Sequence, residues 1–406
     1  MAATTLPLDG IRVLDFAHMM QGPWAAEMLG DLGADVIKVE AVDGGERGRQ
    51  AGTVFLNGQS AQFLAMNRNK RSVAINLKDP AGRLLAEQLV ETADVLVQNF
   101  RPGVMERLGL GWEQVRELNA GLVYCSASGY GRAPAHPRMP GQDLLAQART
   151  GALWLTGTQQ DNPTPAGPFV ADVHAATMLA LGATAALLER QHTGRGRLVE
   201  VDLVGAMLHQ TTQEVVAAVN SGTEPVRPSV PGSAYLEAPY GVHATRDGFV
   251  AISLTTMAAL AEGLGSAALL ADFPDKEAAV ERRDELNARV GELVRELDSA
   301  TCLTRLAAAG VWCAPVNDYA AMVQDEMVAW PQRRLQVTHP QVGDMELVGN
   351  PIRLDGEQLP ARRPAPLLGE HTREVLAEVE IGDDLEDLIA RGAVGIGLAR
   401  AGRGHG

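Results

Sequence analysis

The sequence predicts an α/β protein in which a large domain with a Rossmann-like, doubly wound parallel sheet is joined to a smaller α+β domain. Two observations carry this prediction. Short β-type runs alternate with helical segments along the first half of the chain, a pattern typical of a mostly parallel sheet covered on both faces. The stretch 220–240 is rich in Pro and Gly, which marks a domain boundary. The chain has 406 residues, enough for two or three domains.

The first elements form a β-α-β unit. Ile11–Ala17 is a short β-type run, and Val36–Val39 is a second one. Between them, Trp24–Leu32 suits a helix with Gly33 at its end, because glycine readily adopts the left-handed conformation that closes helices. No GxGxxG motif follows the first strand, so the dinucleotide-binding fingerprint is absent.

The alternation continues beyond this unit. Later strands are expected at Arg71–Ile75, 93–100, 121–130 and within 193–203. Helices are expected at Pro80–Thr92, 102–110, 112–119 and from about Asp172 onward. The segment 240–254 predicts a hairpin that turns at Asp247-Gly248, because Asp-Gly is a strong turn signal. Charged helical segments follow at 275–310, and two late helices are expected within 367–379 and 383–394.

These elements divide the chain into three parts and a tail. Residues 1–220 form the first part of the large domain, 221–325 the small α+β domain, 326–395 a return to the large domain, and 396–406 a disordered tail. No internal repeat interrupts this order.

Composition and charge narrow the class of function. The formal net charge of −15 disfavours non-specific nucleic-acid binding, because phosphates are repelled at long range. Cys125, Cys302 and Cys313 are widely spaced and odd in number, which indicates a reducing cytoplasm rather than a disulfide framework. The N-terminus resembles no secretory signal, and the apolar run 173–188 is broken by polar residues, so we expect a buried helix and no membrane partner. The histidines lack metal-like spacing, so no metal is expected.

Asp172 opens a long apolar run and is the strongest candidate for chemistry. As a structural residue it would be an N-cap whose side chain accepts an early helix N–H. As a functional residue it would be a nucleophile, because the apolar residues around it, from Phe169 to Val173, remove much of its water. In that interpretation the helix dipole keeps the carboxylate ionised. Both interpretations remain open, and Asp143 resembles another helix start.

Several basic residues and one histidine have both a structural and a functional interpretation. His18 follows the first strand, where α/β sheets bind ligands, and is otherwise a satisfied loop or core histidine. The segment 67–72 (NRNKRS), with Arg68, Lys70 and Arg71, is either a solvated basic loop or a phosphate site. Arg101 and Arg107 lie across a turn and a helix start, where guanidinium groups could also hold phosphates.

A set of motifs in a fixed order resembles the class III (CaiB/BaiF-type) CoA-transferases, the family of formyl-CoA transferase and carnitine CoA-transferase. The motifs are LDGIRVLDFAHMMQGPWAAEMLGDLGADVIKVE, NRNKRSVAINLKDPAGRLLAEQLVETADVLVQNFRPGVMERLGLGWEQVRELNAGLVYCSASGYG, TGRGRLVEVDL, YGVHATRDGFVAI and PLLGEHTREVLAEV. The similarity extends from Leu6 to about Val394. It implies a CoA-binding large domain and an interlocked homodimer that acts in cytoplasmic acyl-CoA metabolism.

The resemblance implies that Asp172 is the nucleophile of a CoA-transferase. CoA would move from an acyl-CoA donor to a free carboxylic acid, through an aspartyl mixed anhydride and then an aspartyl-CoA thioester. CoA thioesters would be substrates, and no permanently bound cofactor is implied. Developing oxyanions would be met by N–H donors from loop backbone, and water must be excluded because it would hydrolyse the anhydride.

The resemblance also implies a CoA site along the strand ends of the large domain. Its members would be His18, Met20, Ile75, Asn76, Leu77, Lys78, Asn99, Phe100, Arg101 and Arg107. The first two would sit near the thioester and the next four beside the adenine. The following three would line the nucleotide, and the last would meet a phosphate.

The chain departs from formyl-CoA transferase in ways that concern the acceptor. Met20 stands where that enzyme has a glutamine, and its glycine-rich active-site loop has no counterpart, so we expect an acceptor other than oxalate. Two other functions stay open. An α-methylacyl-CoA racemase-type isomerase shares the fold but needs a His–Asp pair, and Gln142 stands at the histidine position. The chain could also be a non-catalytic subunit of a heteromeric CoA-transferase.

Overall fold

The computed structural model describes residues 5–131, 139–222, 225–379 and 384–397. The chain forms two compact units, and each is described by itself. The larger unit comprises residues up to 146, 169–207 and from 331 onward, and the smaller unit comprises 147–168 and 208–330. The domain boundaries expected from the sequence, with the small domain at 221–325, stay a prediction, because compactness alone does not show which parts fold independently.

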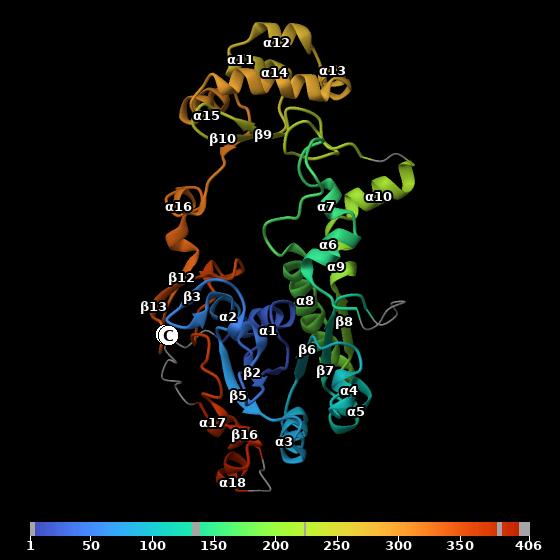
Figure 1. Ribbon diagram of the computed structural model, residues 1–406, viewed down its shortest axis with the longest axis vertical. Helices are drawn as coiled ribbons and strands as arrows, with labels where there is room; N and C mark the ends of the chain where they lie inside the picture. Colours follow the sequence, from blue (N-terminus) through green and yellow to red (C-terminus); the bar gives the residue numbers. More distant parts are fainter. Residues whose placement is uncertain (1–4, 132–138, 223–224, 380–383, 398–406) are drawn as a thin grey trace. The chain divides into compact units, whose positions relative to one another are not determined.

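The larger unit is built on a seven-stranded sheet with the order β16-β5-β2-β1-β6-β7-β8 (Figure 1). Its strands are β1 (Arg12–Asp15), β2 (Asp35–Glu40), β5 (Lys70–Ile75), β6 (Val95–Gln98), β7 (Val123–Ser128), β8 (Leu198–Asp202) and β16 (Val394–Gly395). Six strands are parallel, and β16 pairs antiparallel with β5 at one edge. The order of the parallel strands reverses between β1 and β6, which is the doubly wound arrangement that the sequence predicts. Sheets of this kind bind ligands beyond the carboxyl ends of the strands at that reversal, here called the switch point.

Helices cover both faces of this sheet. One face carries α1 (Gln21–Asp31) and α8 (Val170–Thr193), which pack with Val13 of β1. The opposite face carries α3 (Pro80–Glu91), α5 (Trp112–Leu118), α17 (Thr372–Leu376) and α18 (Leu385–Ala390). Leu14 packs with this second group, as expected because successive strand residues point to opposite faces. Both faces of the sheet are therefore covered by helices, as is usual for a parallel sheet.

α8 is the one helix in the described ranges that is long and apolar enough to cross a membrane, judged by length and composition alone. Its apolar residues have another explanation, since Ala176, Leu179 and Ala183 are buried in the core shared with α1 and the sheet. Gly182 lets α8 approach β8 closely, because a Cβ there would lie 2.6 Å from Cγ1 of Val199. This packing agrees with the buried helix expected from the sequence.

Smaller elements complete the larger unit. They are η1 (Arg47–Gln50), β3 (Phe55–Leu56), β4 (Gln59–Ser60), α2 (Ala61–Met66), α4 (Val104–Arg107), β12 (Arg334–His339), β13 (Gly343–Val348), β14 (Arg353–Leu354) and β15 (Glu357–Gln358). α6 (Asp143–Arg149), α9 (Leu203–Gln210) and η2 (Trp330–Gln332) lie where the chain passes between the two units.

The smaller unit contains a three-stranded antiparallel sheet with the order β11-β10-β9. Its elements are α7 (Ala152–Leu155), α10 (Thr212–Ser221), β9 (Gly241–Ala244), β10 (Phe249–Ile252), α11 (Met257–Leu264), α12 (Ala267–Asp272), α13 (Lys276–Glu281), α14 (Arg283–Arg295), α15 (Ser299–Ala308), β11 (Cys313–Pro315) and α16 (Tyr319–Met322). The predicted hairpin at Asp247-Gly248 is present, and the N–H of Thr245 donates to the carbonyl of Gly248 at its turn. Leu260, Phe273 and Leu286 are fully buried in this unit's own core.

Most elements expected in the first half of the chain are confirmed within one to three residues, including the first β-α-β unit. The two late helices are present but shorter than expected, since α17 and α18 span only Thr372–Leu376 and Leu385–Ala390 and Val394 belongs to β16. The sequence analysis did not anticipate the β12–β13 hairpin, the antiparallel strand β16 or the helices α9 to α12. The loop expected at 132–141 falls largely on residues outside the described ranges, as does the tail from 398 onward.

Candidate active site

The loop after β1 is fastened to the loop after β6, directly at the switch point. The backbone N–H of His18 donates to Oδ1 of Asn99 at 2.8 Å, and Nδ2 of Asn99 donates back to the carbonyl of His18 at 2.7 Å. The imidazole packs edge-to-face on Phe100, with ring centroids 5.0 Å apart. Three residues that the sequence analysis assigned to CoA binding thus meet at one place, although they lie about 80 positions apart.

The hydrogen bonds around His18 indicate which of its ring nitrogens carries the proton. The backbone N–H of Arg47 donates to Nδ1 at 3.2 Å, whereas the nearest carboxylate oxygen, Oε2 of Glu46, is 3.7 Å away and too distant for a hydrogen bond. Nδ1 is therefore an acceptor, and we assign the proton to Nε2 on this basis. The ring is partly exposed and can offer an N–H donor to a ligand.

Glu46 orders the backbone of the same loop. Its Oε2 accepts from the N–H groups of Met19 and Gly48, both at 2.9 Å. Burial alone would raise the pKa of Glu46, but the Lys38 ammonium, the adjacent His18 side chain and these two hydrogen bonds lower that pKa to about 2. The carboxylate therefore stays charged and holds Met19 in the left-handed conformation, with φ of 70°.

Met20 and Gly22 bring the start of α1 against the end of β1. Met20 is 7% exposed and is the N-cap residue of α1, and its carbonyl accepts from the N–H of Trp24. A Cβ at Gly22 would lie 2.2 Å from the Cβ of Ala17, a separation that no side chain can tolerate. Glycine is required there because the helix turns directly over the strand end.

Asp172 lies in the first turn of α8 and is half-buried. The helix begins at Val170 with Phe169 as the N-cap residue, so the interpretation of Asp172 as the N-cap is wrong. Its carboxylate accepts no hydrogen bond from any described residue. The far end of α8 lies at the amino ends of β6 and β7, because Arg190 donates to the carbonyl of Gly121 and to Asp94. The first turn is therefore at the opposite edge of the sheet, beside the carboxyl-terminal ends of the strands.

Asp143, at the start of α6, supplies the cap that Asp172 does not. Its Oδ2 accepts from the backbone N–H of Ala171 at 2.8 Å and of Asp172 at 3.1 Å. Burial, followed by the charge of Asp143, raises the pKa of Asp172 to about 7. The expectation that the helix dipole keeps Asp172 ionised is therefore not met at neutral pH, because burial and the charge of a second carboxylate at the helix start outweigh the dipole. The sequence showed Asp143 only as a local helix start, since nothing in the spacing reveals a partner 28 residues away.

Asp143→Asn is expected to move the pH dependence of the reaction at Asp172. Asparagine keeps an acceptor oxygen for the two N–H groups but removes the charge, so the pKa of Asp172 falls. Because only the carboxylate attacks, the rate of enzyme acylation should reach half its maximum near pH 7 in the parent protein and about one pH unit lower in the variant. Rapid-quench acylation measured across pH checks this. Asp143→Ala, which also removes the cap, should lose about 1 kcal/mol of stability, and an unshifted profile for Asp143→Asn would contradict the assignment.

The other residues assigned to CoA lie at the ends of β5 and β6. Ile75 is buried, Leu77 packs on the core, and Oδ1 of Asn76 accepts from the N–H of Lys78. The side chains of Lys78, Arg101 and Arg107 are exposed, and none of them has a carboxylate partner among the described residues. The structure thus places these cations on the carboxyl edge of the sheet, free to meet an anionic ligand.

The basic segment 67–72 is neither a solvated loop nor a phosphate site, so both interpretations of it are wrong. Arg68 is paired with Asp31 and Glu27, Lys70 with Asp15, and Arg71 with Asp35, Glu374 and Glu378. All three cations are at least 95% buried. Each therefore serves as a buried internal counter-ion and is not exposed to a phosphate.

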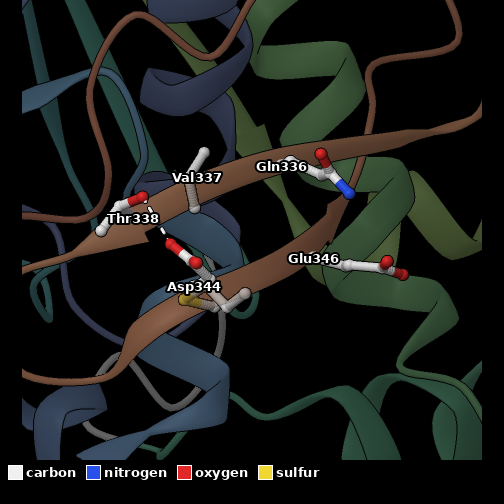
Figure 2. Close-up of a pocket in the computed structure, with 6 residues that line it drawn as sticks. Gln336, Val337, Thr338, Asp344 and Glu346 are labelled. Atoms are coloured by element: carbon white, nitrogen blue, oxygen red, sulfur yellow. Dashed lines mark hydrogen bonds between the residues drawn. The ribbon is translucent and has the colours of Figure 1, made fainter.

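A pocket of about 370 Å³ lies elsewhere, on the β12–β13 hairpin. Figure 2 shows its residues on two neighbouring strands, with Thr338 donating to Asp344 across the hairpin. None of the residues that line it was assigned to catalysis or CoA. Nor do the described residues contain any group of three or more His, Cys, Asp and Glu side chains that could hold a metal ion.

Comparison with known proteins agrees with this geometry. Residues 8–372 match CoA-transferase family III. The chain is 31% identical to the succinyl-CoA:glutarate CoA-transferase of Mus musculus, over 96% of this chain and 90% of that protein. It is 34% identical to the succinyl-CoA–L-malate CoA-transferase beta subunit of Chloroflexus aurantiacus, over 93% and 95%. A CaiB/BaiF family protein from Brucella suis superposes with a TM-score of 0.82 at 30% identity, covering 93% of this chain and all of that one.

A doubly wound sheet with a half-buried acid beside its switch point is a scaffold for chemistry on a bound thioester. The chain belongs to CoA-transferase family III and is an enzyme of this class. The resemblance stated from the sequence motifs is confirmed over nearly the whole chain.

Proposed function

We propose that the protein moves CoA from an acyl-CoA donor to a free carboxylic acid, with Asp172 as the covalent nucleophile. The observation that carries the proposal is the state of Asp172. Its carboxylate is half-buried and accepts no hydrogen bond from the described residues, and burial raises its pKa to about 7. A carboxylate without hydration or partners is a stronger nucleophile than one in water, and raised pKa values of this kind cluster at functional sites.

The reaction follows from this acid in two exchanges. An Oδ of ionised Asp172 attacks the thioester carbonyl carbon, a C–O bond forms, and the C–S electron pair leaves with CoA as thiolate. The thiolate then attacks the aspartyl carbonyl of the mixed anhydride, which releases the donor acid and leaves an aspartyl-CoA thioester. The acceptor carboxylate then attacks the aspartyl carbonyl of this thioester, which forms a second mixed anhydride and releases CoA as thiolate. The thiolate attacks the acceptor's acyl carbonyl in that anhydride, which forms the new acyl-CoA and releases the Asp172 carboxylate. No ATP is needed, because one thioester replaces another of similar energy.

The proposed CoA site is the carboxyl edge of the sheet around the switch point. Phe100 and the imidazole of His18 would form one wall, and the buried Met20 would close its base. Lys78, Arg101 and Arg107 supply positive charge without an internal carboxylate partner, which is notable in a chain of net charge −15. CoA carries several phosphate charges, and guanidinium groups bind phosphate oxygens in pairs.

Arg101→Ala and Arg107→Ala are each expected to raise the KM for acyl-CoA about tenfold and leave kcat nearly unchanged, because each removes one charge-assisted hydrogen bond to a non-reacting phosphate. Steady-state kinetics at fixed acceptor checks this. Arg116→Ala is the matched control, because Arg116 is also exposed but already pairs with Glu113. An effect of equal size in the control would show that general surface charge, and not a CoA site, is responsible.

Dicarboxylic acids are the acceptor class that the relatives favour. The relatives named above are a succinyl-CoA:glutarate and a succinyl-CoA–L-malate transferase, so we propose a succinyl-CoA-type donor and a dicarboxylate acceptor. The test is to incubate the protein with several acyl-CoAs and a panel of mono- and dicarboxylic acids and follow new thioesters by mass spectrometry. Exchange with dicarboxylates supports the proposal, and the absence of exchange with every pair overturns it.

Two alternatives can be told apart from the transferase. An α-methylacyl-CoA racemase-type isomerase would exchange an α-proton with deuterium in the absence of any acid. It is disfavoured because Gln142, an exposed residue that cannot shuttle protons, stands where that chemistry needs a histidine. The third possibility is a subunit of a heteromeric transferase, since one relative is named as a beta subunit.

We propose instead an interlocked homodimer in the cytoplasm. Tyr319 and Met327 are 85% and 88% exposed in the single chain, and a partner copy would cover such apolar side chains. Cys302 and Cys313 are free thiols, which suits a reducing compartment. Sedimentation of the purified chain, together with its activity alone, decides between a homodimer and a heteromer.

A further inference from the structure

Gln21, the first residue of α1, has a buried amide nitrogen without a partner. The side chain is 4% exposed, and Nε2 has no hydrogen-bond partner. Leaving a buried donor unsatisfied destabilises a folded protein by about 1–3 kcal/mol, so an orphaned group of this kind calls for an explanation. A ligand that accepts its hydrogen bond provides one.

The geometry of α1 and α8 places Gln21 at the same helix ends as Asp172. Both helices lie on one face of the sheet and pack against each other, and Ala25 and Ala176 belong to the same buried cluster. Gln21 lies four residues before Ala25, and Asp172 lies four residues before Ala176. Residues four apart share a helix face, so both side chains lie one turn beyond the contact between the helices.

The two helices also run in the same direction. α1 leads from the carboxyl end of β1 to the parallel strand β2, so it begins at the carboxyl edge. α8 begins at that edge as well, because Arg190 fixes its other end beside the amino ends of β6 and β7. Two parallel, packed helices therefore present an amide and a carboxylate at neighbouring first turns.

Two backbone N–H groups near Asp172 are not available as donors to a ligand. The N–H groups of Ala171 and Asp172 would be natural donors to an anion at the start of α8, but both already donate to Asp143. These two N–H groups cannot also bind a developing negative charge. The amide of Gln21 remains as a donor that is already buried and uncommitted.

We propose that the side-chain amide of Gln21 is the oxyanion donor for acyl transfer at Asp172, an assignment that rests on the proposed function. When an Oδ of Asp172 adds to the thioester carbonyl, the C=O electron pair moves onto oxygen, and Nε2–H of Gln21 donates to that oxyanion. As the C=O bond re-forms, the C–S bond breaks and its electron pair leaves with the CoA sulfur. The donor keeps its proton throughout, and its desolvation is already part of the folded state, as preorganised catalysis requires.

Gln21→Leu tests the role, because leucine has nearly the same volume and lacks the amide. We expect acylation of the enzyme by a competent acyl-CoA, followed by rapid quench and intact-mass measurement, to slow about 10²- to 10³-fold. The dissociation constant for the acyl-CoA should stay within about twofold, because the oxyanion exists only in the transition state. Stability to urea should stay equal or rise, because an unsatisfied buried donor is gone.

Gln62→Leu in α2 is the matched control, since Gln62 also has a buried Nε2 without a partner and was not assigned to the site. It should leave acylation unchanged. Unchanged acylation by Gln21→Leu would overturn the inference. Slower acylation in a variant that is also less stable to urea would overturn it as well, because the lost stability would then explain the lower rate. Failure of the parent protein to transfer CoA would instead overturn the proposed function, so the two failures are distinguishable.

Discussion

Asparagine in place of Asp172 is expected to lower CoA exchange by at least about 10⁴-fold while the chain stays folded. The asparagine side chain fills the same volume, but its amide cannot form the mixed anhydride. Exchange is measured as new thioester formed from a donor and an acceptor that the parent protein accepts. The covalent adduct is measured by mass spectrometry of the protein after the reaction is quenched. The parent should show a covalent adduct at residue 172, and the variant none. Exchange within tenfold of the parent would rule out the covalent mechanism.

The same substitution should stabilise the fold at high pH. Because the pKa of Asp172 is raised to about 7 by burial and by Asp143, the native state binds this proton more tightly than the unfolded chain does. The free energy of unfolding of the parent therefore falls as pH rises from about 4 to about 7, and Asp172→Asn lacks this fall. The variant should melt higher than the parent at pH 8 and equally at pH 4. Glu117→Gln, which removes an exposed carboxylate on α5, should show no such difference.

The sheet could be predicted because the residue patterns that indicate its strands and helices each lie within a short stretch of the sequence. Runs such as Ile11–Ala17 and Val36–Val39 are apolar and β-branched, and the helices between them start and stop at recognisable residues. A parallel sheet then brings the residues after each strand to one edge, which is why His18 and Asn99 could be expected together. Their hydrogen bonds bear out this part of the argument, although their role in binding CoA stays a prediction.

The charged interior could not be predicted for the opposite reason. The segment 67–72 appeared as a basic loop because its partners are distant in sequence: Arg71 pairs with Asp35 and with Glu378, which are 36 and 307 positions away. Local composition counts charge but does not show which charges will meet. For the same reason the sequence did not indicate that Asp143 caps α8. The unpaired amide of Gln21 could be recognised only once the packing of the folded chain was known.

A buried ion cluster under the candidate active site should dominate the stability of the larger unit. Asp15, at the end of β1, accepts from Nζ of Lys38 at 3.2 Å and of Lys70 at 2.8 Å, and none of the three side chains is exposed. Although burial raises the pKa of Asp15, the two ammonium groups lower it below its usual value. The carboxylate of Asp15 is thus the shared hydrogen-bonded counter-ion of two buried cations.

Asp15→Ala is therefore expected to destabilise the protein by about 3–5 kcal/mol, because it leaves two ammonium groups buried without their shared counter-ion. Lys38→Met should have a smaller effect, since Asp15 keeps Lys70 as a partner. Urea unfolding at pH 7 measures both. The two lysines also donate to the carbonyls of Ala17 and Pro23, on either side of the His18 loop. The loss of stability should therefore come with a loss of CoA affinity at temperatures where the variant remains folded. A change below about 1 kcal/mol would mean that the freed lysines reach solvent and that this cluster does not hold the loop.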